Sequence, residues 1–281
     1  MNPHLLLIDA LNLIRRIYAV DANQSHHSEE HMLKACCARV AHACKKLLTT
    51  TNATHAIAVF DGEKSWRYHF YKDYKHSRAP MPETLKSALP HFKAAIEETG
   101  IVVFEPTNDE ADDIIATLAH KAANNQINNT IVSTDKGFLP HLNEHIEVYD
   151  YFKKQHLNEQ HIQERFAVEQ HKLIDFWALA GDKTNDIPGV KGIGVKSAQQ
   201  LVNKYSSIED ALIDELNLKS ANVVFHPSET NKPIDHNEYY AINDKGSFSL
   251  LLHGTQKQGS RGSEALSKMN KENIKYSYSK K

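Results

Sequence analysis

Three apolar runs of strand length end in aspartate. The run "HLLLID" ends at Asp9, "HAIAVFD" ends at Asp61 and "TIVSTD" ends at Asp135. If these runs form parallel strands of one sheet, their carboxyl ends meet at the edge where ligands bind in open α/β sheets. Acids also commonly begin loops, and for any one of the three that plain interpretation is the stronger. Three carboxylates at one edge nevertheless favour a cation site.

A further group of acids opens the segment "TNDEADDIIATLAHKA", which has the periodicity of a helix. Asp109, Glu110, Asp112 and Asp113 fall within one turn. Acids are favoured at a helix N-terminus, and Asn108 or Asp109 can cap it. Capping uses one or two acids, whereas this turn holds four.

Carboxylates gathered at one sheet edge repel each other and cannot all stay ionised at neutral pH without cations. Oxygen ligands select hard ions, so the pattern predicts Mg²⁺, with Mn²⁺ as a substitute. Two such ions can activate water and stabilise the leaving oxygen of a phosphodiester. The sequence therefore indicates metal-dependent hydrolysis of nucleic acid.

Bases and aromatic residues alternate in "WRYHFYKDYKHSRAPMP", which follows the strand that ends at Asp61. Its bases could hold a phosphate, and its aromatic rings could stack on frayed bases. An amphipathic surface loop with buried tyrosines explains the segment equally well. The residues concerned are Arg67, Lys72, Lys75 and Arg78, with Tyr68, Phe70, Tyr71 and Tyr74 between them.

The glycine-rich stretch "GDKTNDIPGVKGIGVKSA" could be a nucleotide-binding loop or a hairpin that grips a nucleic-acid backbone. Val195 separates Gly194 from Lys196, and a helical segment rather than a strand precedes the stretch, so neither a P-loop nor a dinucleotide fingerprint fits. We therefore predict no nucleotide cofactor. A helix, a hairpin and a second helix remain, with glycines that admit a phosphate and amides that bind it.

The order of elements predicts an α/β fold. Apolar, strand-like runs alternate with helical segments up to Phe152, which indicates a mostly parallel sheet flanked by helices. Shorter helices follow. We predict a nuclease domain over 1–155, a helix-hairpin-helix subdomain over 156–216 and a polar, poorly ordered tail over 217–281. The predicted strands are His4–Asp9, His55–Asp61, Ile101–Pro106, Thr130–Asp135 and Ile146–Phe152; the predicted helices are Glu29–Thr49, Pro82–Thr99, Glu110–Asn124, Asn158–Phe166, His171–Ala180 and Val195–Tyr205.

Composition sets wider limits. No apolar run approaches the roughly 20 residues of a membrane span. The three cysteines are clustered and odd in number, which favours reduced thiols in a cytoplasmic protein over a disulfide framework. The net charge of −2 shows no bulk basicity. An acidic body can still bind DNA when its acids surround metal ions and its bases line the approach.

Six segments together resemble the 5′-nuclease family, which includes the 5′→3′ exonuclease domain of bacterial DNA polymerase I and free-standing flap endonucleases. The resemblance covers about residues 1–215 and implies a PIN-like 5′-nuclease fold, a DNA substrate with a 5′ flap or a single-strand/duplex junction, and a monomer. The segments are "IDALNLIRR", "VFDGE", "YKHSRAPMP", "NDEADDIIATLA", "STDKGF" and "LAGDKTNDIPGVKGIGVKSAQQL".

The resemblance also implies roles for individual residues. A first metal site comes from Asp9, Asp61, Glu110 and Asp112, with Asp112 as the principal direct ligand, and a second site comes from Asp113, Asp135 and Asp182. Lys75 and Arg78 correspond to the family's phosphate-contacting pair. Backbone carbonyls of Leu179, Ala180, Pro188, Val190 and Ile193 would hold K⁺, and DNA would contact Gly192, Ile193, Gly194, Val195, Lys196 and Ser197.

The sequence departs from the family pattern in three places. Gly137 stands where the family has a second-site aspartate. Asn185 and Asp186 stand where the family's G-D-x-x-D-N motif has Asp and then Asn. The polar tail after Leu216 does not resemble the helical end of the family, either through divergence or through a reading-frame change.

Two lost carboxylates weaken the case for a second ion, because an amide binds Mg²⁺ more weakly than a carboxylate does. They leave open an alternative function as a DNA-junction-binding protein with weak or no catalysis. A metal-dependent ribonuclease on a related fold is a third possibility, against which the hairpin and "YKHSRAPMP" argue.

Overall fold

The chain forms two compact units in the computed structural model, which describes residues 2–22, 28–208, 210–211, 243–244 and 247–248. The first unit comprises Met1–Trp66 and Ala79–Ile162, and the second comprises Arg67–Arg78 and Gln163–Lys281. The basic, aromatic segment therefore belongs with the C-terminal part of the chain. The predicted polar tail over 217–281 falls outside the described residues, except for a short antiparallel pair, β9 (Asn243–Asp244) with β10 (Ser247–Phe248).

A six-stranded sheet with the order β3-β2-β1-β4-β5-β6 forms the centre of the first unit. All neighbours pair in parallel except β6, which runs antiparallel to β5. The chain moves outward from β1 through β2 to β3 and then crosses to the other side of β1. Ligands bind at such a switch point in doubly wound sheets. The strands are β1 (His4–Asp9), β2 (His55–Val59), β3 (Val102–Phe104), β4 (Asn128–Val132), β5 (Ile146–Asp150) and β6 (Gln155–Leu157).

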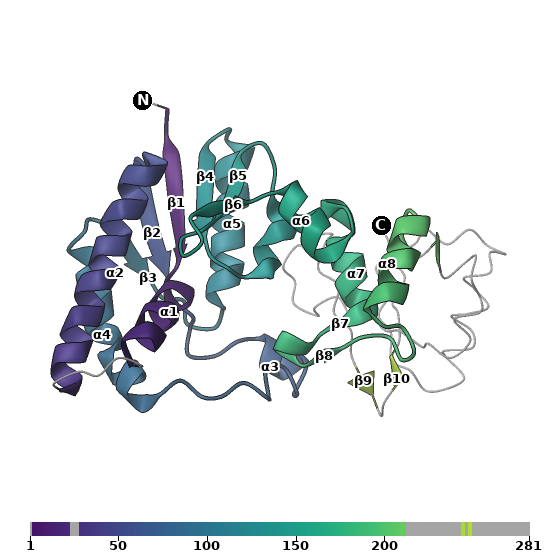
Figure 1. The fold of residues 1–281 in the computed structure, drawn as a ribbon, viewed down its shortest axis with the longest axis horizontal. Coiled ribbons are helices and arrows are strands. Elements are labelled where there is room, and N and C mark those ends of the chain that lie inside the picture. Colours follow the sequence, from purple (N-terminus) through teal and green to yellow (C-terminus); the bar gives the residue numbers. More distant parts are fainter. Residues whose placement is uncertain (1, 23–27, 209, 212–242, 245–246, 249–281) are drawn as a thin grey trace. The chain divides into compact units, whose positions relative to one another are not determined.

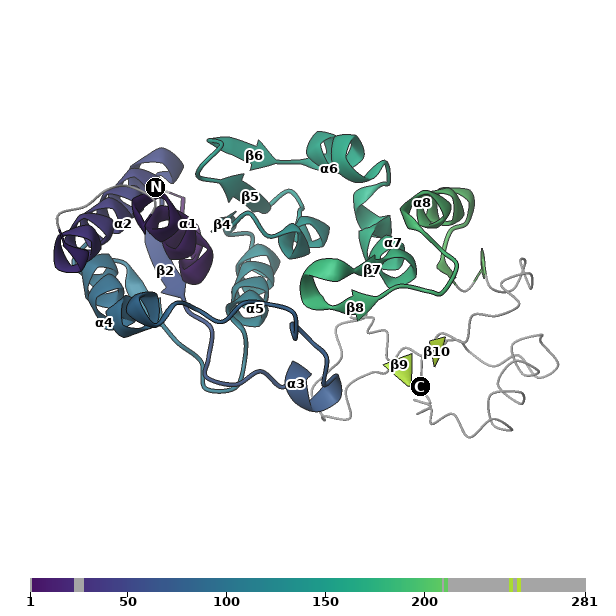
Figure 2. The same ribbon diagram turned by 60° about the horizontal axis from the view of Figure 1, so that its bottom comes forward.

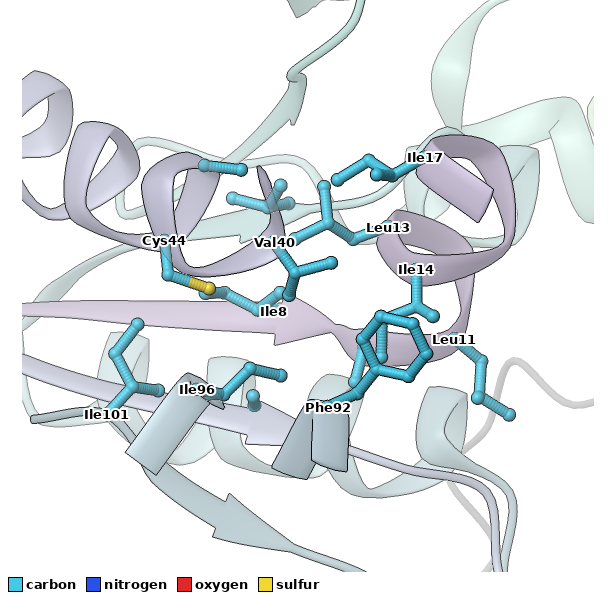
Figure 3. Close-up of a cluster of buried hydrophobic side chains, with 14 of the residues drawn as sticks. Ile8, Leu11, Leu13, Ile14, Ile17, Val40, Cys44, Phe92, Ile96 and Ile101 are labelled. Carbon is cyan, nitrogen blue, oxygen red and sulfur yellow. The ribbon is translucent and has the colours of Figure 1, made fainter. Parts of the chain in front are cut away.

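Helices cover both faces of this sheet. On one face α1 (Ala10–Ala22), α2 (Glu29–Thr51) and α4 (Glu83–Glu97) enclose a core around Ile8 of β1, as Figure 3 shows. On the other face α5 (Ala111–Asn124) packs against β1, β2, β4 and β5 (Figure 2). Alternate residues of a strand point to opposite faces, so apolar residues in succession bury both faces of β1.

Local signals fix the ends of the long helix α2. It begins after Ser28, whose Oγ accepts a hydrogen bond from the backbone N–H of His31 at 3.2 Å. Glu29 and Glu30 occupy the first turn, where the helix dipole favours acids. The helix ends at Thr51, and its C-cap, Asn52, adopts the left-handed conformation at φ 50°.

The second unit contains two helices joined by a tight hairpin. α7 (Leu173–Ala180) leads into β7 (Gly181–Asp182), which pairs antiparallel with β8 (Ile187–Pro188) before α8 (Val195–Lys204), as Figure 1 shows. The hairpin arms cross closely at Gly189, where an added Cβ would lie 2.4 Å from the carbonyl carbon of Ala180. The unit also contains the short helix α3 (Arg67–Phe70), while α6 (Glu159–Phe166) crosses the boundary between the two units.

Four of the five predicted strands end earlier than expected, and among them β3 ends at Phe104 rather than Pro106 and β5 ends at Asp150 rather than Phe152. Asp9 ends β1 as predicted, but β2 ends at Val59 and β4 ends at Val132. The prediction that Asp61 and Asp135 end their strands is therefore wrong. Both acids lie beyond the strands, where the Asp135 N–H donates to Ser133 Oγ at 3.1 Å and the Asp61 carboxylate accepts the Ala111 N–H at 2.8 Å. None of the described helices is long and apolar enough to cross a membrane.

Candidate active site

Asp9 is a buried carboxylate at the switch point of the sheet, with 7% of its surface exposed. Its Oδ1 accepts the Asn12 N–H at 3.1 Å, and its Oδ2 accepts the Ser133 hydroxyl at 2.8 Å. The pKa of Asp9 is raised to about 7, chiefly by burial and in smaller part by the charges of Asp61 and Asp135, while the two hydrogen bonds oppose the shift. The carboxylate at the end of β1 and the carboxylates of two loops thus influence one another at this edge.

We expect Asp9→Asn to stabilise the metal-free protein at high pH. The folded pKa of about 7 exceeds the ordinary 3.8, so the buried carboxyl favours folding below about pH 4 and loses that contribution as the pH rises through 7. Asparagine keeps the shape without the charge. In a chelator at pH 8 its melting temperature should exceed that of wild type by a few degrees, because about 1 kcal/mol shifts the melting temperature of a protein this size by roughly 2–4 °C. The advantage should shrink towards pH 5, and a difference independent of pH would contradict the assignment.

The start of α5 gathers the acids Asp61, Glu110 and Asp113. Asp61 Oδ1 accepts the first helical N–H, that of Ala111, at 2.8 Å. Glu110 is buried and forms a reciprocal capping box with Asp113, whose Oδ2 lies 3.4 Å from the Glu110 nitrogen. Two of the four acids in this turn thus serve as caps, and the N-cap is Glu110 rather than Asn108 or Asp109. Asp112 is half-buried within the same turn.

Gly62 makes this arrangement possible. A Cβ at this position would lie 2.4 Å from the carbonyl oxygen of Pro106 and 2.9 Å from that of Asp109. The Gly62 N–H donates to the Asp109 carbonyl at 3.1 Å. The close approach fixes the loop before α5 against the residue that follows Asp61.

Asn12 and Ser133 link the ends of β1 and β4, and sequence reasoning missed both. Ser133 Oγ accepts from the Asp135 N–H and donates to Asp9, while Asn12 Oδ1 accepts from the Thr134 N–H at 3.3 Å and from its hydroxyl at 3.1 Å. Asp135 Oδ1 accepts the Gly137 N–H at 2.7 Å. The signal that could have found them is their position, beside the aspartates of "IDALN" and "STD".

The donor set at this edge suits a hard divalent cation, because every candidate ligand is a carboxylate. Within the described ranges, no three His, Cys, Asp or Glu side chains are gathered closely enough to hold an ion as they stand. Asp9, Asp61 and Asp135 accept backbone or hydroxyl donors. Binding a cation would exchange some of these hydrogen bonds for metal–oxygen contacts.

The candidate phosphate-binding residues Lys75 and Arg78 lie in the second unit with Asp182. Arg78 donates through Nε to the Thr184 carbonyl at 3.2 Å and through a terminal nitrogen to Asn185 Oδ1 at 2.7 Å. Asn185 Nδ2 in turn donates to Asp182 Oδ2 at 2.7 Å. The Lys75 ammonium lies 4.9 Å from the ring centre of the buried Tyr74. Neutral oxygens thus orient the Arg78 guanidinium.

The hairpin brings together the five residues whose carbonyls are candidate K⁺ ligands. The Leu179 carbonyl accepts the Val190 N–H at 2.8 Å, and the Val190 carbonyl accepts the Ile193 N–H at 2.9 Å. Each carbonyl oxygen has a second lone pair. Ala180 and Pro188 lie on the facing arms, where Gly181 pairs with Pro188.

The candidate DNA contacts lie at the start of α8. Gly194 is its N-cap, so the first amides of the helix have no partner within the helix itself. Gly192 has a φ of 87°, a conformation that glycine adopts without strain. Val195, Lys196 and Ser197 are exposed.

Comparison with known proteins finds a family match for both parts of the chain. Residues 4–167 match the N-terminal resolvase-like domain of 5′-3′ exonucleases, and residues 168–237 match their C-terminal SAM fold. The chain is 80% identical over 215 residues to Flap endonuclease Xni of Pseudoalteromonas translucida (strain TAC 125), which covers 76% of this chain and 84% of that protein.

Solved structures share the fold at low sequence identity. T5 5′-exonuclease with bound zinc ions matches with a TM-score of 0.62 and 19% identity, over 81% of each chain. A bacteriophage T5 flap endonuclease in a pseudo-enzyme–product complex with DNA and metal ions matches with a TM-score of 0.59 and 20% identity, also over 81% of each chain. The predicted α/β class with a helical second part is thereby confirmed.

Proposed function

Because the chain belongs to the 5′-3′ exonuclease family, we propose that it is a metal-dependent, structure-selective 5′ flap endonuclease that hydrolyses phosphodiester bonds in branched DNA. The observation that carries this function is the 80% identity to a flap endonuclease over 84% of that protein's length. Matches to both family domains cover the residues that bear the candidate site.

The acidic edge supplies the metal ligands in this proposal. Asp112 is the principal ligand. Asp9 keeps its proton up to about pH 7 when no cation is bound, so a cation would compete with that proton. When bound, Mg²⁺ would supply Lewis acidity and a more acidic water. Asp9, Asp61, Glu110 and Asp112 form the first site, and Asp113 and Asp135 contribute to a second.

Lys75 and Arg78 hold the phosphate next to the bond that is cut. Arg78 is oriented by a carbonyl and an amide rather than by a carboxylate. Its charge therefore remains available to a phosphate, with which a guanidinium can make two parallel hydrogen bonds. Both cations stabilise the charge that develops on the phosphate during hydrolysis.

The hairpin grips the DNA backbone away from the reaction. The open amides at the start of α8 would bind a phosphate. A K⁺ ion on the carbonyls of Leu179, Ala180, Pro188, Val190 and Ile193 would add positive charge beside it. DNA affinity should therefore depend on K⁺ more than on Na⁺ at equal ionic strength.

We assign the nuclease domain to 1–155, the DNA-binding subdomain to 156–216 and a separate tail to 217–281, and we expect a monomer.

A second candidate function is DNA-junction binding with weak catalysis. Gly137 and Asn185 favour it, because each stands where a second-site carboxylate is expected. Junction binding would need only the hairpin and the basic segment.

A panel of labelled substrates tests the proposal. DNA with a 5′ flap, DNA with a 3′ flap of equal length, single strands and a flap of RNA are incubated with Mg²⁺ or with chelator. We expect the 5′ flap to be cut fastest and only with Mg²⁺. Equal cleavage of both flaps would contradict 5′ selectivity, and preference for the RNA flap would favour the ribonuclease interpretation.

A further inference from the structure

One side chain, that of Asp186, joins the hairpin loop to the basic segment 67–78. Its Oδ2 accepts the backbone N–H of Ser77 at 2.7 Å, and its Oδ1 accepts the Ser77 hydroxyl at 2.6 Å. The two residues are 109 positions apart in sequence. Two short, charge-assisted hydrogen bonds to one residue fix direction as well as distance.

Unusual backbone geometry supports this contact from both sides. Asp186 has a φ of 55° and Lys75 has a φ of 54°, both in the left-handed region. The Asp186 carbonyl accepts the Tyr71 hydroxyl at 3.2 Å, and the Lys75 N–H donates to the Asn185 carbonyl at 3.0 Å. Strained residues persist where their surroundings hold them, and here each lies within the same set of hydrogen bonds.

The clamped residue, Ser77, directly precedes Arg78. The same loop that holds Ser77 also accepts both hydrogen bonds from the Arg78 guanidinium, at Thr184 and Asn185. The hairpin loop therefore accepts hydrogen bonds from Lys75, Ser77 and Arg78 of the segment.

The order of the two loop residues matters for charge. In this chain the amide of Asn185 faces Arg78 and the carboxylate of Asp186 faces Ser77. The reverse order would place a carboxylate on Arg78 and form an ion pair that competes with a phosphate. The order Asn then Asp gives the guanidinium neutral hydrogen-bond partners, while the nearby Asp186 carboxylate, whose pKa the Arg78 charge helps to lower, bonds to Ser77 instead.

We propose that Asp186 is a positioning residue, which clamps Ser77 and thereby holds Lys75 and Arg78 in the arrangement that receives a DNA phosphate. The inference rests on the proposed function of those two cations. Asp186 itself touches no reacting atom in this account. Its removal should slow the chemical step while leaving DNA affinity intact.

Four variants separate the clamp from a simple effect of charge. Asp186→Gly removes the carboxylate and keeps the left-handed backbone. Asp186→Asn removes the same charge but keeps an acceptor for the Ser77 N–H and a donor for its hydroxyl. Ser77→Ala removes one of the two hydrogen bonds. Asp73→Ala removes an exposed acid from the same segment and serves as the matched control.

We expect single-turnover cleavage of a 5′ flap to fall about tenfold in Asp186→Gly, the scale of a lost charge-assisted hydrogen bond, and less in Ser77→Ala. Asp186→Asn and Asp73→Ala should stay near wild type. Flap affinity in chelator should not fall in any of them. The three substitutions of aspartate remove a negative charge, and Ser77→Ala leaves the charge unchanged. Equal rates in Asp186→Gly, Asp186→Asn and Asp73→Ala would overturn the proposal.

Limited proteolysis tests the clamp without any activity. Trypsin should cut after Lys72, Lys75 or Arg78 faster in Asp186→Gly than in wild type or Asp186→Asn, while sites in the first unit are cut at unchanged rates. Unchanged cutting of the segment would overturn the clamp even if cleavage of DNA fell. If wild type cut no flap at all, the proposed function would fail, and the proteolysis would still decide the clamp.

A variant with three substitutions tests whether Asp186 acts through the two cations. Asp186→Gly should have little further effect on cleavage when Lys75 and Arg78 are already alanine, because a positioning residue acts only through the groups it holds. A full tenfold loss in that background would show that Asp186 acts elsewhere and would contradict the proposal.

Discussion

Asp112→Ala will cleave a 5′ flap on the order of 10³-fold more slowly than wild type while binding the same DNA with similar or greater affinity. Asp112 lies in the first turn of α5, beside Glu110 and Asp113, which cap that helix. As the principal metal ligand it would act on the hydrolytic step rather than on the grip of the hairpin. Single-turnover cleavage in Mg²⁺ and fluorescence anisotropy in chelator measure the two effects separately.

Two further variants make this result specific. Asp112→Asn keeps the size of the side chain and should lose nearly as much activity, which excludes a packing effect. Asp109→Asn removes the same charge from the preceding loop and should change the rate little. Cleavage by Asp112→Ala at the wild-type rate would remove Asp112 from the metal site.

Arg78→Ala will lower the single-turnover rate about 10²-fold, and Lys75→Ala will lower it by a smaller factor. Arg78 presents a planar guanidinium that neutral oxygens already orient. Lysine offers a point charge without that geometry, so Arg78→Lys should recover only part of the loss. The rate at saturating DNA should fall more than the affinity, since the cations act on charge that develops during hydrolysis.

Lys45→Ala is the control for these two variants. It removes one positive charge from the exposed side of α2, where alanine suits the helix. Its rate at saturating DNA should match that of wild type. If Lys45→Ala and Arg78→Ala lowered the rate alike, general electrostatic attraction would account for the effect and the specific role of Arg78 would be lost.

The sequence predicted the sheet and the helices that follow it because their signals are local. The run at His4–Asp9 is continuous and apolar, and it forms β1 with the predicted bounds. The start of α8 at Val195 was also predicted, because glycines mark the end of the preceding hairpin. Such patterns depend on neighbours in sequence and not on the rest of the fold.

The sequence alone did not reveal contacts between residues that are far apart in the chain. Ser133 reaches Asp9 across 124 positions, and Asp186 reaches Ser77 across 109. Nothing in either residue type marks it as a partner, because serine and aspartate are also common in loops. The contact at Asp61 is of the same kind, since its carboxylate accepts an amide of α5 that lies 50 positions away in sequence.

From the sequence alone, Gly137 and Asn185 each look like the loss of a carboxylate. In the structure, Asn185 accepts a hydrogen bond from Arg78 and donates one to Asp182. It therefore links a candidate phosphate-binding residue to a candidate metal ligand. Gly137 donates its N–H to the Asp135 carboxylate, which thereby caps the 3-10 helix Lys136–His141.

Cleavage of a 5′-labelled flap by wild-type protein under single-turnover conditions, resolved to the nucleotide, tests the central claim most directly. The account predicts one main product, cut close to the junction of single strand and duplex, that appears with Mg²⁺ and disappears with chelator. Tight, flap-selective binding with no product at any Mg²⁺ concentration would contradict it and leave a junction-binding protein.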